Sequence, residues 1–423
     1  MNGDPRHPEF MSSKPVNNTP EFLEFDEHAM FGPGGTDLSP IVLREMYRPY
    51  VNPWSDQLVE CYEETLVLLK RLYNTRNDMV ITIGPIRSAM DTVMCSIAEP
   101  GDHVMVCSNG YWSEMFMEIL RAHGADPIAC NGPWGLPMDP QRVSDELARR
   151  NDIKAVVLTH VETSTGVINP VKEIGQIVKS RGLPFVLDCA QSIGGMPIMT
   201  DEWQVDFVLG GTHKCMSAPA GLGFIGISPE GWRVVERRKT PINGWYSNLL
   251  VWRDTWMERN RNWYTFPSSS LFGLRAVLDY IFKLGPEEIY KRYRLAAKAI
   301  RWGASEMGLG LYVDGTHCPG CDSEKKFCAD TATPIVYPAG VTHKTFAGMM
   351  ARKYNIAIGG GLGERSATYF RVGPTGIVQI VPANVLKLMT AIGVSMNECG
   401  ANVNLEAGLN VAARILDEVE PLR

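Results

Sequence analysis

Residues 185–224 read FVLDCAQSIGGMPIMTDEWQVDFVLGGTHKCMSAPAGLGF, and this stretch decides the fold. Two short apolar runs, at 184–187 and 205–209, are typical of strands that are buried on both faces, as in a parallel sheet. Asp188 directly follows the first run, and Lys214 follows the second in a turn rich in glycine and threonine. Because α/β proteins build their sites at the carboxyl ends of parallel strands, we expect Asp188 and Lys214 at neighbouring strand ends.

A carboxylate and a lysine amine in this arrangement suit pyridoxal phosphate (PLP) chemistry. The lysine forms a Schiff base with the aldehyde of the cofactor. The carboxylate keeps the pyridine nitrogen protonated, so that the ring can accept electrons from a substrate carbanion. A turn-capping aspartate and a solvated surface lysine would leave the same pattern, so this pair alone does not decide between the two interpretations.

The sequence around this stretch alternates between strand-like and helix-like patterns. Strands are predicted at 79–82, 103–106 and 154–159, and helices at 57–73, 88–97, 113–123, 141–150 and 172–180. Beyond about residue 287 the pattern changes to a long helix at 289–307, strands near 332–337, 355–359 and 368–372, and an irregular polar segment at 313–330 that is predicted to be a surface loop. The alternation predicts an α/β fold with a mostly parallel, doubly wound sheet.

We predict four segments along the chain. They are a vector-derived leader at 1–10, an N-terminal arm at 11–31, a large cofactor-binding domain at 32–287 and a smaller C-terminal α+β domain at 288–423. The chain has 423 residues with 41 basic and 47 acidic side chains, a net charge of −6, and no uninterrupted run of 18 apolar residues. Nucleic-acid and membrane partners are therefore not expected. Ten cysteines, most of them in apolar contexts, favour a reducing, cytoplasmic location.

Eight motifs occur in a fixed order from Phe31 to the C-terminus. They are FGPGG (31–35), NGYW (109–112), THVETSTGVINP (159–170), LDCAQSIGG (187–195), GTHKCMSAPAGLGF (211–224), TFP (265–267), IGGGLGE (358–364) and FRVGPTG (370–376). On these motifs the chain resembles the class V aminotransferases of PLP fold type I. It is most similar to the alanine–glyoxylate, serine–glyoxylate and pyridoxamine–pyruvate aminotransferases.

The resemblance implies a role around the cofactor ring for each of five residues. Lys214 matches the Schiff-base lysine, and Asp188 matches the partner of the pyridine nitrogen. Trp112 matches the aromatic residue that stacks on the ring, where a flat apolar face fixes the ring plane. Thr163 matches the residue near the ring hydroxyl, and Ala190 matches the small residue under the opposite ring face.

The phosphate site is where this chain departs from the family pattern. The turn TIGPIRS at 82–88 precedes a predicted helix, whose N-terminus is suited to bind an anion. Relatives carry small residues and a hydroxyl here, whereas this chain has Pro85 and Ile86, and Pro85 has no amide to donate. We expect Arg87 to compensate, with Thr212 as a further phosphate donor. His213, which replaces a glutamine or asparagine, either contacts the phosphate or substrate or merely fills its position.

The resemblance also implies a substrate site and a dimer. Arg371 matches the arginine that grips the substrate carboxylate, and we place Gly34 of FGPGG at the substrate. Tyr264 and Thr265 match a segment that reaches the cofactor of the neighbouring subunit, which implies a homodimer with shared sites. The glycine-rich run GGGLGE at 359–364 is interpreted as a flexible turn near the substrate.

The expected activity is a PLP-dependent aminotransferase that moves an amino group from an amino donor to a small 2-oxo acid such as pyruvate or glyoxylate. Another PLP reaction on the same fold, by a lyase, decarboxylase or oxidase, stays open as an alternative. A PLP-binding regulator is disfavoured, since no DNA-binding pattern is present. Cys318, Cys321 and Cys328 have a spacing seen in zinc sites, but free thiols or a labile disulfide fit as well, and no metal is expected.

Overall fold

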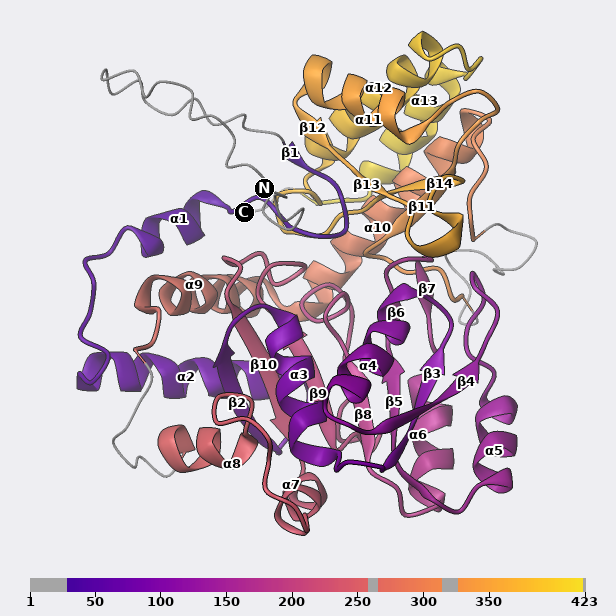
Figure 1. Ribbon diagram of the computed structural model, residues 1–423. Coiled ribbons are helices and arrows are strands. Elements are labelled where there is room, and N and C mark those ends of the chain that lie inside the picture. The colour runs from indigo at the N-terminus through magenta and orange to yellow at the C-terminus, as the bar shows by residue number, and fades with distance from the viewer. Residues whose placement is uncertain (1–28, 258–264, 314–325, 421–423) are drawn as a thin grey trace, which may run out of the picture.

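A seven-stranded sheet forms the centre of the computed structural model, which describes residues 29–257, 265–313 and 326–420 (Figure 1). In spatial order its strands are β2 (Asp78–Ile83), β10 (Leu222–Ile227), β9 (Phe207–Gly211), β8 (Phe185–Asp188), β5 (Ile153–Thr159), β3 (His103–Ser108) and β4 (Asp126–Asn131). The five strands from β9 to β4 pair in parallel, and β10 runs antiparallel to both of its neighbours. The predicted fold class is confirmed.

Helices surround this sheet. They are α2 (Asp56–Leu72), α3 (Ile86–Ile97), α4 (Tyr111–Ala122), α5 (Pro140–Arg149), α6 (Val171–Ser180), α7 (Pro229–Glu236) and α9 (Ser268–Leu284). α3 packs on β9 and β10, and α4 packs on β3 and β5 (Figure 1). α3 follows β2 in the chain and α4 follows β3, so each helix begins just beyond the carboxyl end of a strand. Strands covered in this way need apolar residues on both faces, and every residue of β8, β9 and β10 is buried.

β10 and β4 were not among the predicted strands. β10 contains Gly223 and Gly226, and glycine inside a strand is normally unfavourable. The neighbouring strands explain the glycines. A Cβ at Gly226 would lie 2.6 Å from Cγ1 of Val208, and one at Gly223 would lie 2.8 Å from Oγ1 of Thr82. β4 is the edge strand, and its mixture of exposed and buried residues hides its periodicity.

A second, smaller sheet lies in the C-terminal part of the chain. It comprises β11 (Thr333–Val336), β14 (Tyr369–Val372) and β13 (Gly359–Gly360), all antiparallel, and is accompanied by α10 (Pro286–Glu306), α11 (His343–Tyr354), α12 (Pro382–Glu398) and α13 (Leu405–Leu416). The N-terminal strand β1 (Ala29–Met30) joins this part by pairing in parallel with β12 (Ile356–Ala357) (Figure 1). The domain boundary at 287/288 stays a prediction.

Gly359 and Gly360, at the start of the glycine-rich run 359–364, form the short strand β13, so the expectation of a turn is wrong for these two residues. Gly359 pairs with Arg371 across the small sheet, and Gly360 pairs with Phe370. A Cβ at Gly359 would lie 3.1 Å from Cδ of Pro33, and one at Gly361 would lie 2.7 Å from the carbonyl oxygen of Ser366. The glycines are needed because other parts of the chain approach their backbone closely.

The prediction that residues 313–330 form a surface loop is wrong for residues 328–330. Residues 314–325 lie outside the described part of the chain, but Cys328, Ala329 and Asp330 are buried. The reason is the buried guanidinium of Arg301 on α10. It donates to the Ala329 carbonyl at 2.6 Å and lies 3.4 Å from a carboxylate oxygen of Asp330, which also pairs with Lys326.

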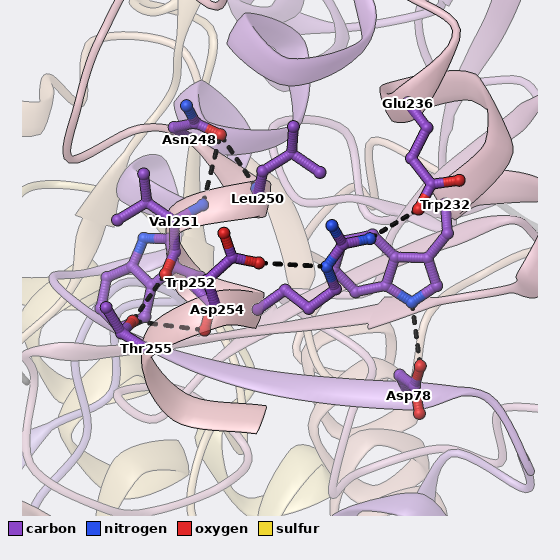
Figure 2. Close-up of polar contacts among 10 residues, drawn as sticks. Asp78, Trp232, Glu236, Asn248, Leu250, Val251, Trp252, Asp254 and Thr255 are labelled. Carbon is purple, nitrogen blue, oxygen red and sulfur yellow. Dashed lines mark hydrogen bonds and ion pairs between the residues drawn. The ribbon is translucent and has the colours of Figure 1, made fainter. Parts of the chain in front are cut away.

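Polar contacts hold the segment after α7 against the large sheet (Figure 2). The indole Nε1 of Trp232 donates to Asp78 at 2.9 Å, which links α7 to β2. Asn248 caps α8 (Leu249–Trp252) by accepting from two backbone amides of its first turn. Arg253, which follows α8 directly, pairs with Glu236 of α7 at 2.6 Å. None of the helices in the described ranges is both long and apolar enough to cross a bilayer.

Candidate active site

A cavity of about 240 Å³ opens at the carboxyl ends of β5, β8 and β9. Nine of the predicted site residues line it: Gly34, Ile86, Arg87, Trp112, Thr163, Asp188, Ala190, His213 and Lys214. Pro33, Pro85, Met90, Val161 and Gln191 complete the lining. Residues from six separate stretches of the sequence therefore meet in one place, at the edge of the sheet where the parallel strands end.

Asp188 and Lys214 are both buried in this cavity. Asp188 is the last residue of β8, and its Oδ1 accepts from the backbone amide of Ala190 at 2.8 Å. Burial raises the pKa of Asp188, and the positive charge of Lys214 opposes that rise. Burial lowers the pKa of Lys214, and the charge of Asp188 opposes that fall. A lysine with a lowered pKa is more readily deprotonated, which is the state of a nucleophile or a base.

Trp112 presents its ring to the lysine. Nζ of Lys214 lies 5.3 Å from the centroid of the indole ring. Trp112 is the second residue of α4, and its Nε1 is buried with no hydrogen-bond partner among the described residues. The ring is thus placed to stack on a flat ligand that lies between α4 and the strand ends.

Glu162, to which the sequence analysis assigned no role, fixes the start of α4. Its buried carboxylate accepts from the backbone amides of Trp112 at 3.3 Å and Ser113 at 3.0 Å, and from the hydroxyl of Ser164 at 2.6 Å. A Cβ at Gly110 would lie 2.3 Å from Cγ of Glu162, so only glycine allows this approach. Glu162 lies three residues after the predicted strand at 154–159, inside the motif THVETSTGVINP, and this position was the available signal.

Two basic side chains, for which the described residues supply no acidic partner, gather at the N-terminus of α3. The guanidinium carbon of Arg87, an exposed residue, lies 5.3 Å from the Trp112 ring centroid. His213 has a buried Nδ1 with no hydrogen-bond partner in the described part of the chain. Burial, with the charges of Lys214 and Arg87, lowers the pKa of His213 to about 4, so its imidazole is neutral near pH 7. The first amides of a helix also lack intrahelical partners, and this corner can therefore bind an anion.

Thr163 and Gln191 form a polar wall. The hydroxyl of Thr163 donates to Oε1 of Gln191 at 3.4 Å, and Nε2 of Gln191 donates to the carbonyl of Thr331 at 2.9 Å. The sequence analysis missed Gln191 as a lining residue. Ala190 lies between Asp188 and Gln191 in the chain. Gly34 faces open space, since no atom lies within 4 Å of a Cβ built on it.

Arg371 is buried next to this wall but does not line the cavity itself. Its Nε donates to the carbonyl of Gly360 at 2.7 Å, and its Nη1 to that of Thr163 at 3.4 Å. Burial lowers the pKa of Arg371. Among carboxylates that the structure describes, none lies within ion-pair distance of its guanidinium. A buried cation held only by backbone carbonyls has the capacity to bind an external carboxylate.

Three predicted contacts are not assembled within the described subunit. The hydroxyl of Thr212 donates to the carbonyl of Pro219, and Thr212 does not line the cavity. Thr265 is exposed and lies away from the cavity lining, and Tyr264 lies outside the described residues. Their contacts with the cofactor stay predictions.

The cysteine-rich loop can be assessed only in part. Cys318 and Cys321 lie outside the described residues, and Cys328 is buried. Within the described ranges there is no group of three or more His, Cys, Asp or Glu side chains that could hold a metal ion.

Comparison with known proteins gives consistent matches. Residues 48–315 match the model of the family described as aminotransferase class-V. An uncharacterized aminotransferase of Methanocaldococcus jannaschii is 31% identical, over 91% of this chain and 96% of its own. The crystal structure of ureidoglycine–glyoxylate aminotransferase from Bacillus subtilis is similar with a TM-score of 0.86 at 27% identity, covering 92% of this chain and 98% of that chain. For pyridoxamine–pyruvate aminotransferase from Mesorhizobium loti the TM-score is 0.84 at 25% identity, with 94% and 99% covered.

Proposed function

The chain belongs to the aminotransferase class-V family, and from that premise we propose that it uses pyridoxal 5′-phosphate to move an amino group from an amino donor to a small 2-oxo acid. The observation that carries the proposal is the meeting of Lys214, Asp188 and Trp112 in one buried cavity. Glyoxylate and pyruvate are the acceptors to test first, because they are named in the two similar solved enzymes.

The residues around the cavity fit this cofactor. It needs an amine for its aldehyde, a carboxylate for its ring nitrogen, an aromatic face and an anion site, and Lys214, Asp188, Trp112 and the N-terminus of α3 can supply these. Ala190 would lie under the ring, and Thr163 near its hydroxyl. When bound, the cofactor supplies an electron sink for the charge that forms at the donor's α-carbon.

Lys214 is the proposed acid and base of the reaction. Its amine is buried, and burial lowers its pKa. The amine can therefore accept the proton from the α-carbon of the donor and donate it again at a later stage of the amino-group transfer. Burial raises the pKa of Asp188, and the positive charge of Lys214 opposes that rise. A protonated pyridine nitrogen of the cofactor would favour the ionised carboxylate in the same way. The apolar side chains of Met90, Val161 and Ile86 limit the access of water to these groups.

The phosphate would bind at the N-terminus of α3. Pro85, as the N-cap residue, offers neither an amide hydrogen nor a side-chain hydroxyl. We assign the compensating role to Arg87 and His213, which lie on the same corner of the cavity, together with the amide of Ile86. Thr212 would contribute only if its hydroxyl left the carbonyl of Pro219.

Arg371 is the proposed partner of the substrate carboxylate, and the open space at Gly34 leaves room for the rest of the substrate. We further propose a cytoplasmic homodimer, in which Tyr264 and Thr265 reach the cofactor of the neighbouring subunit. Two domains, divided near residue 287, complete the proposal. The family membership and the exposure of Thr265 support the dimer.

A half-reaction tests the activity. The protein loaded with PLP is mixed with one amino donor at a time, in the absence of any acceptor, and its visible spectrum is followed. An aminotransferase converts the cofactor to pyridoxamine phosphate and stops, and glyoxylate or pyruvate then restores the original spectrum. Release of ammonia, carbon dioxide or peroxide without this reversible change would show another PLP reaction instead.

A further inference from the structure

The carbonyl that orients Arg371 belongs to a residue that is itself held by a side chain from another element. The Gly360 carbonyl accepts from Nε of Arg371 at 2.7 Å. A Cβ built on Gly360 would lie 3.3 Å from both Cε1 and Nε2 of His343. The imidazole of His343, the first residue of α11, therefore lies over Gly360, and a side chain at position 360 would have to push the ring by a few tenths of an ångström.

The orientation of this imidazole is fixed by Tyr337. The hydroxyl of Tyr337 lies 2.7 Å from Nδ1 of His343. Burial raises the pKa of Tyr337, so the phenol keeps its proton. Burial and the charge of Arg371 lower the pKa of His343, which favours the neutral ring. With a protonated phenol and a neutral imidazole, either Tyr337 donates to Nδ1 or an Nδ1–H donates to the phenol oxygen, and the hydrogen bond holds the ring in both cases.

Tyr337 is in turn held by aromatic packing next to Arg371. Its ring centroid lies 5.2 Å from that of Phe370, the residue before Arg371 on β14, and 6.2 Å from that of Phe346 on α11. Tyr337 is also hydrogen-bonded through its backbone amide to the carbonyl of Thr368 at 3.0 Å. The Tyr337–His343 pair thus bridges α11 and the two strands, β13 and β14, that carry Gly360 and Arg371.

We propose that His343 and Tyr337 are positioning residues for Arg371, and that through Gly360 they set the affinity of the site for the carboxylate of donor and acceptor. The inference rests on the proposed role of Arg371. A long arginine side chain has several rotatable bonds, and a fixed acceptor at Nε restricts them before the substrate arrives. Such preorganisation strengthens binding without adding a contact to the ligand.

A purely structural role for His343 predicts a different result. It would lower the stability of α11 and the small sheet, and every activity would fall together. A positioning role is specific for the carboxylate, so it changes the reaction with an oxo acid and leaves the reaction with the aldehyde that lacks this carboxylate unchanged. Pyruvate and acetaldehyde differ only by the carboxylate and are the matched probes.

The test uses the full-length protein loaded with pyridoxamine phosphate. His343→Ala is expected to raise KM for pyruvate roughly tenfold, which corresponds to about 1.4 kcal/mol, with kcat changed by less than about twofold. Tyr337→Phe should also raise KM for pyruvate, but by a smaller factor. The dissociation constant of PLP and the rate with acetaldehyde should not change. Lys344→Ala, an exposed neighbour on α11, is the control and should match the wild type.

A double-mutant cycle distinguishes the positioning role of His343 from the carboxylate-binding role of Arg371. In the Arg371→Ala background, His343→Ala should have no further effect on KM for pyruvate. Additive effects, or equal losses with pyruvate and acetaldehyde, would overturn the positioning role. If Arg371→Ala raises KM but His343→Ala does not, only the further inference is wrong. If Arg371→Ala leaves KM for pyruvate unchanged, the carboxylate role proposed for Arg371 is itself wrong.

Discussion

The carboxylate of Glu162 accepts the backbone amide of Trp112 at 3.3 Å, so a buried charge holds the start of the helix that carries the aromatic ring. Negative charge is favourable at a helix N-terminus, where amides lack intrahelical partners. β6 (Val161–Glu162), which ends in this residue, lies directly before the turn that carries Thr163. The Glu162 carboxylate therefore holds the wall of the cavity that carries Trp112 against the wall that carries Thr163.

Glu162→Gln should destabilise the protein and weaken cofactor binding together. The glutamine amide brings hydrogens toward the amides of Trp112 and Ser113, which need an acceptor. Buried, charge-assisted hydrogen bonds are lost, and we expect about 2–4 kcal/mol less stability in urea unfolding. Glu118→Gln, on the exposed side of the same helix, is the matched control and should stay within about 0.5 kcal/mol of wild type. A wild-type unfolding curve for Glu162→Gln would contradict this role.

Lys214→Ala should abolish the visible absorbance that PLP gives when it is joined to the purified protein. The buried amine is the group placed to react with the aldehyde, and alanine offers no substitute. An absorption spectrum of each variant after dialysis against PLP is sufficient. Lys154→Ala, an exposed lysine on β5, should keep the absorbance. A spectrum unchanged by Lys214→Ala would assign the attachment to another amine.

Asp188→Ala should reduce turnover by several powers of ten and leave some PLP bound. Removing the carboxylate lets the pyridine nitrogen lose its proton, and each pKa unit is worth about 1.4 kcal/mol. Single-turnover rates with an amino donor measure the effect, and the bound cofactor is quantified from the same samples. Near wild-type rates would show that Asp188 serves only to order the turn at Ala190.

Arg87→Ala should weaken PLP binding by roughly ten- to a hundredfold, which corresponds to about 1.5–3 kcal/mol for a charge-assisted bond. Binding of pyridoxal, which lacks the phosphate, should change much less. The measurement is a pair of dissociation constants for wild type, Arg87→Ala and Arg121→Ala, an exposed arginine on α4 that serves as control. Equal losses for both ligands, or none for PLP, would remove Arg87 from the phosphate site.

The buried His160 should make stability fall with acid. Burial lowers the pKa of His160 to about 4, below its ordinary value of 6.5. Below pH 6.5 the unfolded chain therefore binds a proton that the folded protein excludes, and stability decreases until the pH reaches about 4. For this one group the loss between pH 7 and pH 5 is about 2 kcal/mol. His160→Asn, which keeps a polar partner for Ser192, should reduce the difference in urea-unfolding free energy between these pH values by that amount. An equal pH dependence in the two proteins would exclude His160 as the cause.

The sequence predicted the central strands and the Asp188–Lys214 pair because continuous apolar runs are a local signal. β10 escaped prediction since its glycines are required by side chains of neighbouring strands, which no local pattern records. The glycines at 359–361 were misread for the same reason: their neighbours, Pro33 and Ser366, are visible only in three dimensions.

The predicted site shows the same division. Motif order brought Trp112, Thr163 and Ala190 to the cavity, where the structure places them. Glu162 and Gln191 act through contacts with distant backbone, and His343 through Gly360, so composition and spacing did not single them out. The contacts of Tyr264 and Thr265 stay predictions, since the cofactor that they are expected to reach belongs to a neighbouring subunit.

The pairing of β1 with β12 has a mechanical consequence for the cavity. Phe31 donates its backbone amide to Ala357 and accepts from that of Gly373, so the first described residues are fastened to the C-terminal part on two sides. Gly34 follows only three residues later. Any rotation of the small sheet relative to the large sheet would therefore move Gly34 and Arg371 together. Asp188 and Lys214 would stay in place with the large sheet.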